Sequence, residues 1–167
     1  MNQSAETADK LAIAEQLANY ARAMDRIDRD LGYAVWHARG TAHYGAMFEG
    51  TGRDFVDWVC ETHSRMVAHV HRVTNILITL DGDTAASEAY VHATLRFEQD
   101  GTLRQGNVFG RYLDRWSRRD GRWAIDHREY VQDIDEIVEA APPLVGAFGG
   151  RRDRDDPSYA VLAAIRS

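Results

Sequence analysis

The spacing of apolar residues changes once along the chain, from a helical pattern to an extended one. Over residues 6–24, apolar side chains recur at intervals of three and four, which predicts an amphipathic helix. The pattern also predicts a short helix over 30–36, a short strand over 40–45 and a longer helix over 52–68. We therefore expect the chain to be mainly helical up to residue 68.

Extended runs follow, separated by Asp-Gly turns. The runs cover 76–80, 85–97, 108–116 and 123–131, and the first is preceded directly by H-V-H-R-V-T-N at 69–75. D-G-D at 81–83, Q-D-G at 99–101 and R-R-D-G at 118–121 join them, and Asp-Gly between such runs is a strong hairpin signal. Helices followed by a hairpin-connected meander predict an α+β fold, with helices packed in the concave face of a curved antiparallel or mixed sheet.

Two parts of different character make up the chain. Residues 1–141 contain no repeat or linker, so we expect a single domain there. Residues 142–167 form a different segment, with P-P, G-G and the charged R-R-D-R-D-D-P at 151–157. Its short apolar end, 159–165, is expected to pack on a neighbouring element or at a subunit interface, with disorder as the alternative.

Composition narrows the classes of partner. The chain has 167 residues and a net charge of −6, which gives no electrostatic reason to expect nucleic acid or an anionic membrane. No apolar run is long enough to span a membrane, and the first ten residues lack the apolar core of a signal peptide. Cys60 is the single cysteine and Lys10 the single lysine, which argues against a disulfide and against Schiff-base chemistry. We expect a soluble cytoplasmic protein.

The stretch at 69–75 places two imidazoles two residues apart. On a strand, His69 and His71 project to the same side, which suits a metal pair, a catalytic histidine with a bystander, or two polar groups bonded to backbone and water. A metal site needs a third ligand. The other five histidines stand at no ligand spacing, and no Glu flanks the pair, so we expect no metal; these histidines are His37, His43, His63, His92 and His127.

Strict alternation along 69–80 sorts the remaining residues of this strand. It puts His71 on one face and Ile76 on the other. The first face would also carry Val73, Asn75 and Leu77, and the second Ile78 and Leu80. Because both faces carry apolar residues, we expect His71 to be covered, which makes it a candidate for acid–base chemistry.

Two residues of the first helix are candidates for the same site. Asp25 stands at the end of the helix, where the helix dipole disfavours a carboxylate. It is either a solvated turn residue or an inward-facing partner that orients an imidazole as a general base. Tyr20, one turn earlier, is either plain core or a hydroxyl with a buried partner.

Arg128 presents a conflict of register. Trp123, Ile125 and His127 share one face of the last run, so strict alternation turns Arg128 away from the more apolar face. Either the inner face of the sheet is polar here, or a β-bulge shifts the register, or Arg128 is an exposed residue paired with Asp126 or Glu129.

The order of these motifs resembles the SnoaL-like branch of the nuclear-transport-factor-2-like superfamily. The resemblance covers about residues 8–135 and rests on Y-A-R-A-M-D-R-I-D at 20–28, H-V-H-R-V-T-N at 69–75, G-R-Y-L-D-R-W at 110–116 and R-R-D-G-R-W-A-I-D-H-R at 118–128. The chain is most similar to the group that contains scytalone dehydratase, bile-acid dehydratase and hexachlorocyclohexane dehydrochlorinase. The resemblance implies a conical α+β barrel, and a homotrimer more readily than a dimer.

The same resemblance implies roles for individual residues. Asp25 and His71 match the group's aspartate–histidine dyad, in which the histidine is the base, Tyr20 matches a pocket tyrosine, and Arg128 matches an arginine near the leaving group. His69 stands where the dehydrochlorinase has cysteine, so its role is open. The expected pocket walls are Trp36, His43, Tyr44, His69 and Asn75.

The activity implied is that of a lyase without a cofactor, most simply a dehydratase acting on a mostly apolar cyclic or polycyclic small molecule. An isomerase or polyketide cyclase uses the same proton abstraction. A non-catalytic ligand carrier or assembly subunit is an alternative of a different class, and it would not need the dyad.

Overall fold

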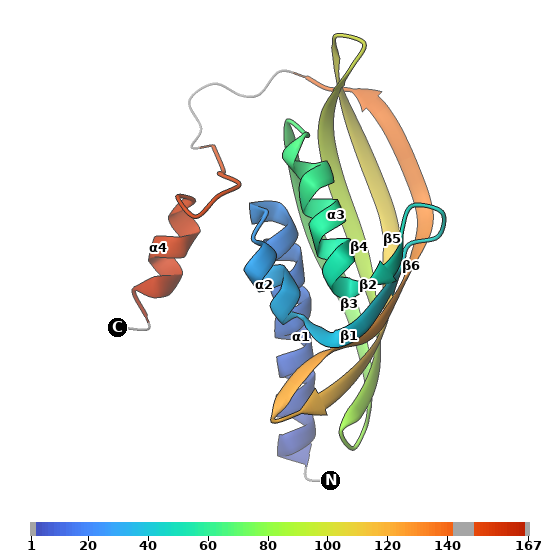
Figure 1. Cartoon of the computed structure of the whole chain (residues 1–167), viewed down its shortest axis with the longest axis vertical. Helices are drawn as coiled ribbons and strands as arrows, with labels where there is room; N and C mark the ends of the chain where they lie inside the picture. Colours follow the sequence, from blue (N-terminus) through green and yellow to red (C-terminus); the bar gives the residue numbers. More distant parts are fainter. Residues whose placement is uncertain (1–2, 142–148, 166–167) are drawn as a thin grey trace.

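The computed structural model describes residues 3–141 and 149–165 (Figure 1). Three helices and two strands come first: α1 (Gln3–Arg26), α2 (Arg29–Ala34), β1 (Trp36–His43), β2 (Glu49–Thr51) and α3 (Gly52–Ser64). Four long strands and a short helix follow: β3 (Ala68–Asp81), β4 (Thr84–Gln99), β5 (Thr102–Arg119), β6 (Arg122–Glu139) and α4 (Pro157–Ala163).

The strands form one curved mixed sheet in the order β2-β1-β6-β5-β4-β3. β1 runs parallel to β6, and the other neighbouring strands are antiparallel. Figure 1 shows α1 and α3 in the hollow of the sheet, with β2 and β3 as separate edges, so the barrel is not closed. The predicted α+β architecture is confirmed.

Each predicted Asp-Gly turn joins two long strands. Asp100 and Gly101 have φ angles of +51° and +74°, and Asp120 and Gly121 have +53° and +76°. Two successive positive φ angles are the signature of a type I′ turn, whose twist matches that of the flanking strands. The strands between the turns are longer than the sequence pattern predicts, and β6 extends to Glu139.

Three predicted boundaries are wrong in the helical part of the chain. α2 ends at Ala34, and Trp36 begins β1, which starts four residues before the predicted strand at 40. α3 ends at Ser64, not at 68, because the backbone N–H of Met66 bonds back to the carbonyl of His63 and closes a tight last turn. The apolar residues at 66–67 therefore belong to the turn into β3.

A bulge in β3 overturns the strict alternation predicted beyond residue 74. Its register with β4 shifts between Thr74 and Leu77, and Asn75 has a φ of +48°. As a result Leu77 is 68% exposed, whereas Ile78 and Leu80 pack against the core. His71 lies before the bulge, on the side of β3 that faces α1.

A second bulge resolves the conflict at Arg128. The register between β5 and β6 shifts because Trp116 pairs with Ile125 while Arg115 pairs with His127, so Asp126 is the extra residue. Ile125 and Arg128 consequently both point inward, and each is 0% exposed. Of the alternatives left open by the sequence, the bulge is the one observed.

The core lies between the concave face of the sheet and one face of α1. Ile13, Leu17, Tyr20 and Met24 recur at intervals of three and four, and all are buried. Burying side chains of this size contributes about 1.5–3 kcal/mol each. This periodicity therefore fixes α1 in the hollow of the sheet and determines which side of its last turn faces β3.

The described part of the C-terminal segment ends in α4, which lies on the side of α1 and α2 away from the sheet (Figure 1). Asp156 caps α4 by accepting a hydrogen bond from the backbone N–H of Ser158. Pro142, where the sequence predicts this segment to begin, lies outside the described residues. No helix among the described residues is long and apolar enough to cross a membrane.

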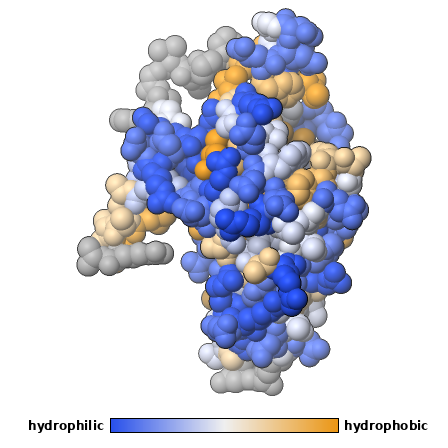
Figure 2. All heavy atoms as spheres, viewed as in Figure 1, coloured by the Kyte–Doolittle hydropathy of each residue, from blue (hydrophilic) through white to orange (hydrophobic). Residues whose placement is uncertain are grey.

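Hydrophilic side chains cover most of the face shown in Figure 2. Apolar side chains gather on that face over the upper end of the sheet and on α4. Exposed apolar residues of β6 include Ile134, Ile137 and Val138, and those in and after α4 are Val161, Leu162 and Ile165.

Candidate active site

A cavity of about 230 Å³ lies between the helices and the concave face of the sheet. Most of its wall is apolar or aromatic, and a few hydroxyl and imidazole groups interrupt it, as in many small-molecule sites. The lining residues are Tyr20, Tyr44, Met47, Phe55, Trp58, Val59, Thr62, His63, Met66, His71, Val91, Ala93, Leu95, Val108, Tyr112, Tyr130 and Gln132.

Asp25 and His71 meet at the edge of this cavity although they are 46 residues apart in sequence. The Nδ1–H of His71 donates to Oδ1 of Asp25 over 2.8 Å, and the backbone N–H of His71 donates to the same carboxylate over 2.9 Å. Because Nδ1 carries the proton, the neutral ring presents a lone pair on Nε2. Nε2 makes no hydrogen bond to the described part of the chain, so it is free to accept a proton.

The end of α1 explains how a carboxylate comes to stand there. Ile27 adopts a left-handed φ of +52°, and the backbone N–H of Asp28 bonds to the carbonyl of Ala23 over 2.9 Å, which closes the helix. Asp25 lies in this last turn, where the carbonyl groups repel its charge. The two N–H donors of His71 compensate for that repulsion, so the position of Asp25 depends on His71.

Two further imidazoles stand beside His71. The ring of His63, from the last turn of α3, lies 4.3 Å from that of His69 and 5.3 Å from that of His71, measured between centroids. The Nε2–H of His69 donates to the backbone carbonyl of Met24 over 2.9 Å. His69 therefore ties β3 to the last turn of α1, next to Asp25.

Burial keeps these two neighbours uncharged. It lowers the pKa of His63 to about 2, with His71 and His69 adding to the effect. Burial also lowers the pKa of His69. Of these three imidazoles, His71 is the one whose ring is hydrogen-bonded to a carboxylate.

The hydroxyl groups of Tyr20 and Tyr44 form a second polar point on the cavity wall, 2.9 Å apart. Burial raises the pKa of Tyr20 well above its usual range, and the neighbouring Tyr44 adds to the shift. Burial likewise raises the pKa of Tyr44. Both phenols therefore stay protonated at neutral pH. Because one hydroxyl donates to the other, the pair has one O–H left to donate to a ligand. The ring of Tyr44 is stacked on Phe55 at 4.1 Å and on Tyr130 at 5.2 Å.

Arg128 lies behind this pair, outside the residues that line the cavity. Its Nε and Nη2 donate to the two carboxylate oxygens of Asp114 over 2.7 and 2.8 Å. Burial works against its charge, but Asp114 raises the pKa of Arg128 well above its usual range. The guanidinium carbon is 4.2 Å from the ring centre of Tyr20 and 3.9 Å from that of Tyr112, so a fixed positive charge backs both rings.

Of the nine residues predicted for the site, three line the cavity and three contact residues that line it. Tyr20, Tyr44 and His71 belong to the lining, while Asp25, His69 and Arg128 hold or back lining residues. The structure does not bring the other three to the cavity. Trp36 is buried beside Arg128. His43, the last residue of β1, forms a hydrogen bond with Glu129 of β6. Asn75 lies at the bulge in β3.

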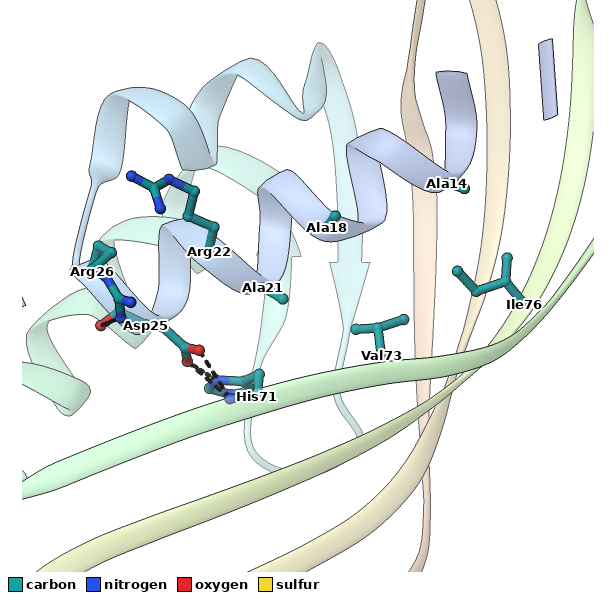
Figure 3. A pocket seen from close by; sticks show the side chains of 9 residues that line it. All are labelled: Ala14, Ala18, Ala21, Arg22, Asp25, Arg26, His71, Val73 and Ile76. Carbon is teal, nitrogen blue, oxygen red and sulfur yellow. Dashed lines mark hydrogen bonds and ion pairs between the residues drawn. The ribbon is translucent and has the colours of Figure 1, made fainter. Parts of the chain in front are cut away.

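The dyad also borders a groove of about 340 Å³ between α1 and β3 (Figure 3). Ala14, Ala18 and Ala21 line it from α1, facing Val73 and Ile76 of β3, and the side chains of Asp25 and His71 point toward one another across its end. Since His71 lines both spaces, its ring forms part of the wall between the cavity and the groove.

Sequence reasoning missed several residues of this site. Tyr112 and Asp114 share the inward face of β5 with Gly110 and Trp116, so alternation along G-R-Y-L-D-R-W would have found them. His63 gave no comparable signal, because its contact with His69 and His71 depends on where α3 ends. In residues 3–141 and 149–165, no group of three His, Cys, Asp or Glu side chains is placed to hold a metal ion.

One family model matches most of the chain. Residues 5–129 match the model of the SnoaL-like domain family. No curated protein matches the chain.

Solved structures of several proteins share this fold. A candidate scytalone dehydratase from Novosphingobium aromaticivorans is 22% identical, with a TM-score of 0.72 over 88% of this chain and 100% of that one. Hexachlorocyclohexane dehydrochlorinase LinA-type3 from Novosphingobium barchaimii is 14% identical, with a TM-score of 0.72 over 85% and 100%. A candidate aromatic ring hydroxylase from N. aromaticivorans is 25% identical, with a TM-score of 0.68 over 80% and 94%.

Proposed function

Because the chain belongs to the SnoaL-like domain family, we propose that it is a cofactor-independent lyase, a dehydratase that removes water from a mostly apolar cyclic substrate. The observation that carries the proposal is the hydrogen bond of 2.8 Å between Asp25 and Nδ1 of His71, with the ring of His71 in the cavity wall. An oriented imidazole with a free Nε2 is the group that removal of a carbon-bound proton requires.

In this proposal, Nε2 of His71 takes a proton from the carbon next to a carbonyl group. The electron pair of the broken C–H bond forms the new C=C bond, and the C–O bond to the departing hydroxyl breaks. The departing hydroxyl then takes the proton from the imidazolium and leaves as water, so His71 returns to its neutral form. Asp25 stabilises the imidazolium in between.

The hydroxyl pair of Tyr20 and Tyr44 would bind the oxygen on which negative charge develops, through the O–H that is not used within the pair. Their hydroxyls remain protonated, and they stand in a buried wall where a hydrogen bond to an oxyanion is strong. Arg128 would act from behind, because its charge lies against the ring of Tyr20 and does not touch the cavity. We propose that it favours charge build-up on the oxygen bound by Tyr20.

The size of the cavity narrows the substrate class. A cavity of roughly 150 Å³ holds a single benzene ring, and sites for drug-sized ligands begin at about 300 Å³. At about 230 Å³, this cavity suits a molecule of one or two rings. We therefore propose a hydroxylated mono- or bicyclic ketone ahead of larger polycyclic substrates.

Product mass tests the proposal. The protein is incubated with a panel of hydroxylated cyclic ketones of one, two and four rings, and each product is weighed by mass spectrometry. Loss of one water that disappears in the His71→Ala variant supports the dehydratase, and His43→Ala, altered outside the cavity, serves as the control. A product of unchanged mass would instead identify an isomerase or a cyclase, and wild-type turnover in His71→Ala would exclude His71 as the base.

A non-catalytic subunit is the alternative of a different class that the sequence leaves open. Such a subunit would bind a ligand or a partner chain without using the dyad. It predicts that panel compounds bind with the same affinity to wild type and to Asp25→Asn, with no product formed by either.

We also propose that the chain forms a homo-oligomer, with a trimer favoured over a dimer. The support is the group of exposed apolar residues at the end of β6, where Ile134 is 65% and Ile137 61% exposed. Light scattering after size-exclusion chromatography gives the mass directly. Ile137→Glu should lower that mass to the monomer value, and a wild-type monomer would contradict the proposal.

A further inference from the structure

The C-terminal segment lies against the ends of the two helices that flank the dyad. We call residues 151–159 the C-terminal clasp. The Nη1 group of Arg152 donates to the backbone carbonyls of His63 and Met66 over 2.9 and 2.8 Å. The carbonyl of His63 belongs to the last turn of α3 and also accepts from the backbone N–H of Met66, whereas the carbonyl of Met66 lies in the turn that follows the helix.

The same segment holds the end of α1. Asp156 is 5% exposed, and its Oδ1 lies 3.3 Å from Nε of Arg26, the residue that follows Asp25. Its carboxylate is fixed within the clasp, because it accepts from the backbone N–H groups of Arg151 and Ser158 over 3.0 and 3.1 Å.

Two further contacts extend the attachment along the outer side of α1 and α2. Nη1 of Arg22 donates to Oγ of Ser158 over 2.9 Å, and the hydroxyl of Tyr159 donates to Asp28 over 2.7 Å. The clasp thus contacts the last turn of α1 on the side opposite to the cavity, and it reaches the last turn of α3 through Arg152.

Both attached turns carry side chains that meet His71. Asp25 bonds it from α1, and the ring of His63 stands 5.3 Å from it on α3. Met66, whose carbonyl Arg152 binds, precedes His71 by only five residues. Arg152 also places a positive charge near the imidazoles, and this charge adds to the lowering of the pKa of His69 that burial causes.

We propose that Arg152 is a positioning residue for the Asp25–His71 dyad. It fixes the end of α3, while Asp156 of the same clasp fixes the end of α1, so that the carboxylate meets the Nδ1–H. Displacement of a catalytic group by about 1 Å can cost on the order of 100-fold in rate. This inference deepens the proposed function and rests on it for the kinetic readout alone.

The test compares Arg152→Met with Arg151→Met in the full-length protein. Met keeps the apolar stem and removes the donors, and the side chain of Arg151 is 53% exposed and binds carboxylates of its own segment. The first readout is the low-field proton resonance of the His71 Nδ1–H, observed by NMR without substrate. The second is the separation of kcat from KM on a substrate found in the panel.

Arg152→Met should broaden or abolish the resonance and lower kcat by about 10- to 100-fold, with a smaller change in KM. Arg152→Lys should retain part of the resonance and part of kcat, and Arg151→Met should match wild type in both. If Arg152→Met does not fold, Arg152→Gln, which keeps one amide donor, is measured with the same expected direction.

A wild-type resonance and a wild-type kcat in a folded Arg152→Met variant would overturn the inference. Equal losses in Arg151→Met would also overturn it, because the effect would then follow from any change in the clasp. If wild type shows the resonance but turns over no compound, the proposed function fails, while the resonance alone decides the role of Arg152.

Discussion

The carboxylate of Asp25 receives two hydrogen bonds from one residue, His71, through its backbone N–H at 2.9 Å and its imidazole Nδ1–H at 2.8 Å. The backbone bond fixes the carboxylate against β3, independently of the rotation of the ring. The ring is then oriented by a group that is already held in place. Asp25 therefore has two separate effects: its bond to the backbone holds α1 against β3, and its bond to the ring orients the imidazole.

Asp25→Asn should therefore fold normally and still lose activity. The amide oxygen of the introduced asparagine can replace one carboxylate oxygen as acceptor. The uncharged amide no longer stabilises an imidazolium, however, and its NH₂ group favours the tautomer of His71 that has no proton on Nδ1. We expect kcat to fall by about 10²–10⁴-fold, the range of a positioned base. Circular dichroism and steady-state kinetics check this, with the exposed Asp30→Asn as control. Unchanged turnover in Asp25→Asn would argue that His71 acts without it.

Tyr20→Phe should reduce kcat more than Tyr44→Phe. Both changes break the hydroxyl pair of 2.9 Å, but Tyr20 alone has the Arg128 guanidinium centred 4.2 Å over its ring. Loss of one donor to a developing oxyanion typically costs about 100-fold or more, and we expect that for Tyr20. Kinetics of the two single variants give the ranking, and the reverse order would assign the oxyanion to Tyr44.

Asp114→Asn should destabilise the protein strongly. Asp114 is 2% exposed and is the carboxylate partner of a fully buried Arg128, so the substitution leaves a buried charge without compensation. Breaking such a pair costs about 3–5 kcal/mol. The control is Asp133→Asn, which breaks the more exposed pair with Arg111 and should cost at most about 1 kcal/mol. Urea unfolding measures both, and similar losses in the two variants would contradict the prediction.

His63 should make the folded state sensitive to acid. Because burial lowers its pKa to about 2, the unfolded chain binds a proton at this residue below about pH 6.5 and the folded chain does not. Neutral His63 therefore contributes fully to the free energy of unfolding above that pH, and this contribution is lost as the pH falls. Between pH 8 and 5, wild type should therefore lose about 2 kcal/mol more unfolding free energy than His63→Leu.

The matched control for this experiment is His43→Gln. Glu129 raises the pKa of His43 through a hydrogen bond, so the stabilisation it provides is present at low pH and is lost as the pH rises. The two variants should consequently shift the pH dependence of urea unfolding in opposite directions. Parallel curves for wild type and His63→Leu would show that His63 takes up its proton in the folded state as well.

The parts of this molecule that could be predicted from sequence are those governed by local rules. The apolar spacing of α1 and the three Asp-Gly turns depend on neighbouring residues, and both were predicted. The position of Arg128 was not, because one extra residue at Asp126 reverses the faces of the side chains that follow it in β6, up to the next register shift at Asp133. Nothing in the local sequence marks the bulge at Asp126.

Some residues of the candidate site could likewise be predicted from the sequence, and others could not. Asp25 and His71 were predicted as a pair on the family pattern, and the structure brings them into contact. His63 could not be predicted, because its approach to His71 depends on the tertiary position of α3. Trp36 was expected on a helix and in a pocket wall, but the chain turns into β1 there and buries the indole beside Arg128.

The bulge at Asn75 also bears on how one molecule meets another. β3 is an edge of the sheet, and its outer side offers backbone donors and acceptors that a strand of a second chain could pair with. The left-handed residue interrupts that row near its middle and bends the strand. We therefore expect this edge, which carries His71, to resist regular strand addition from one copy of the chain to the next.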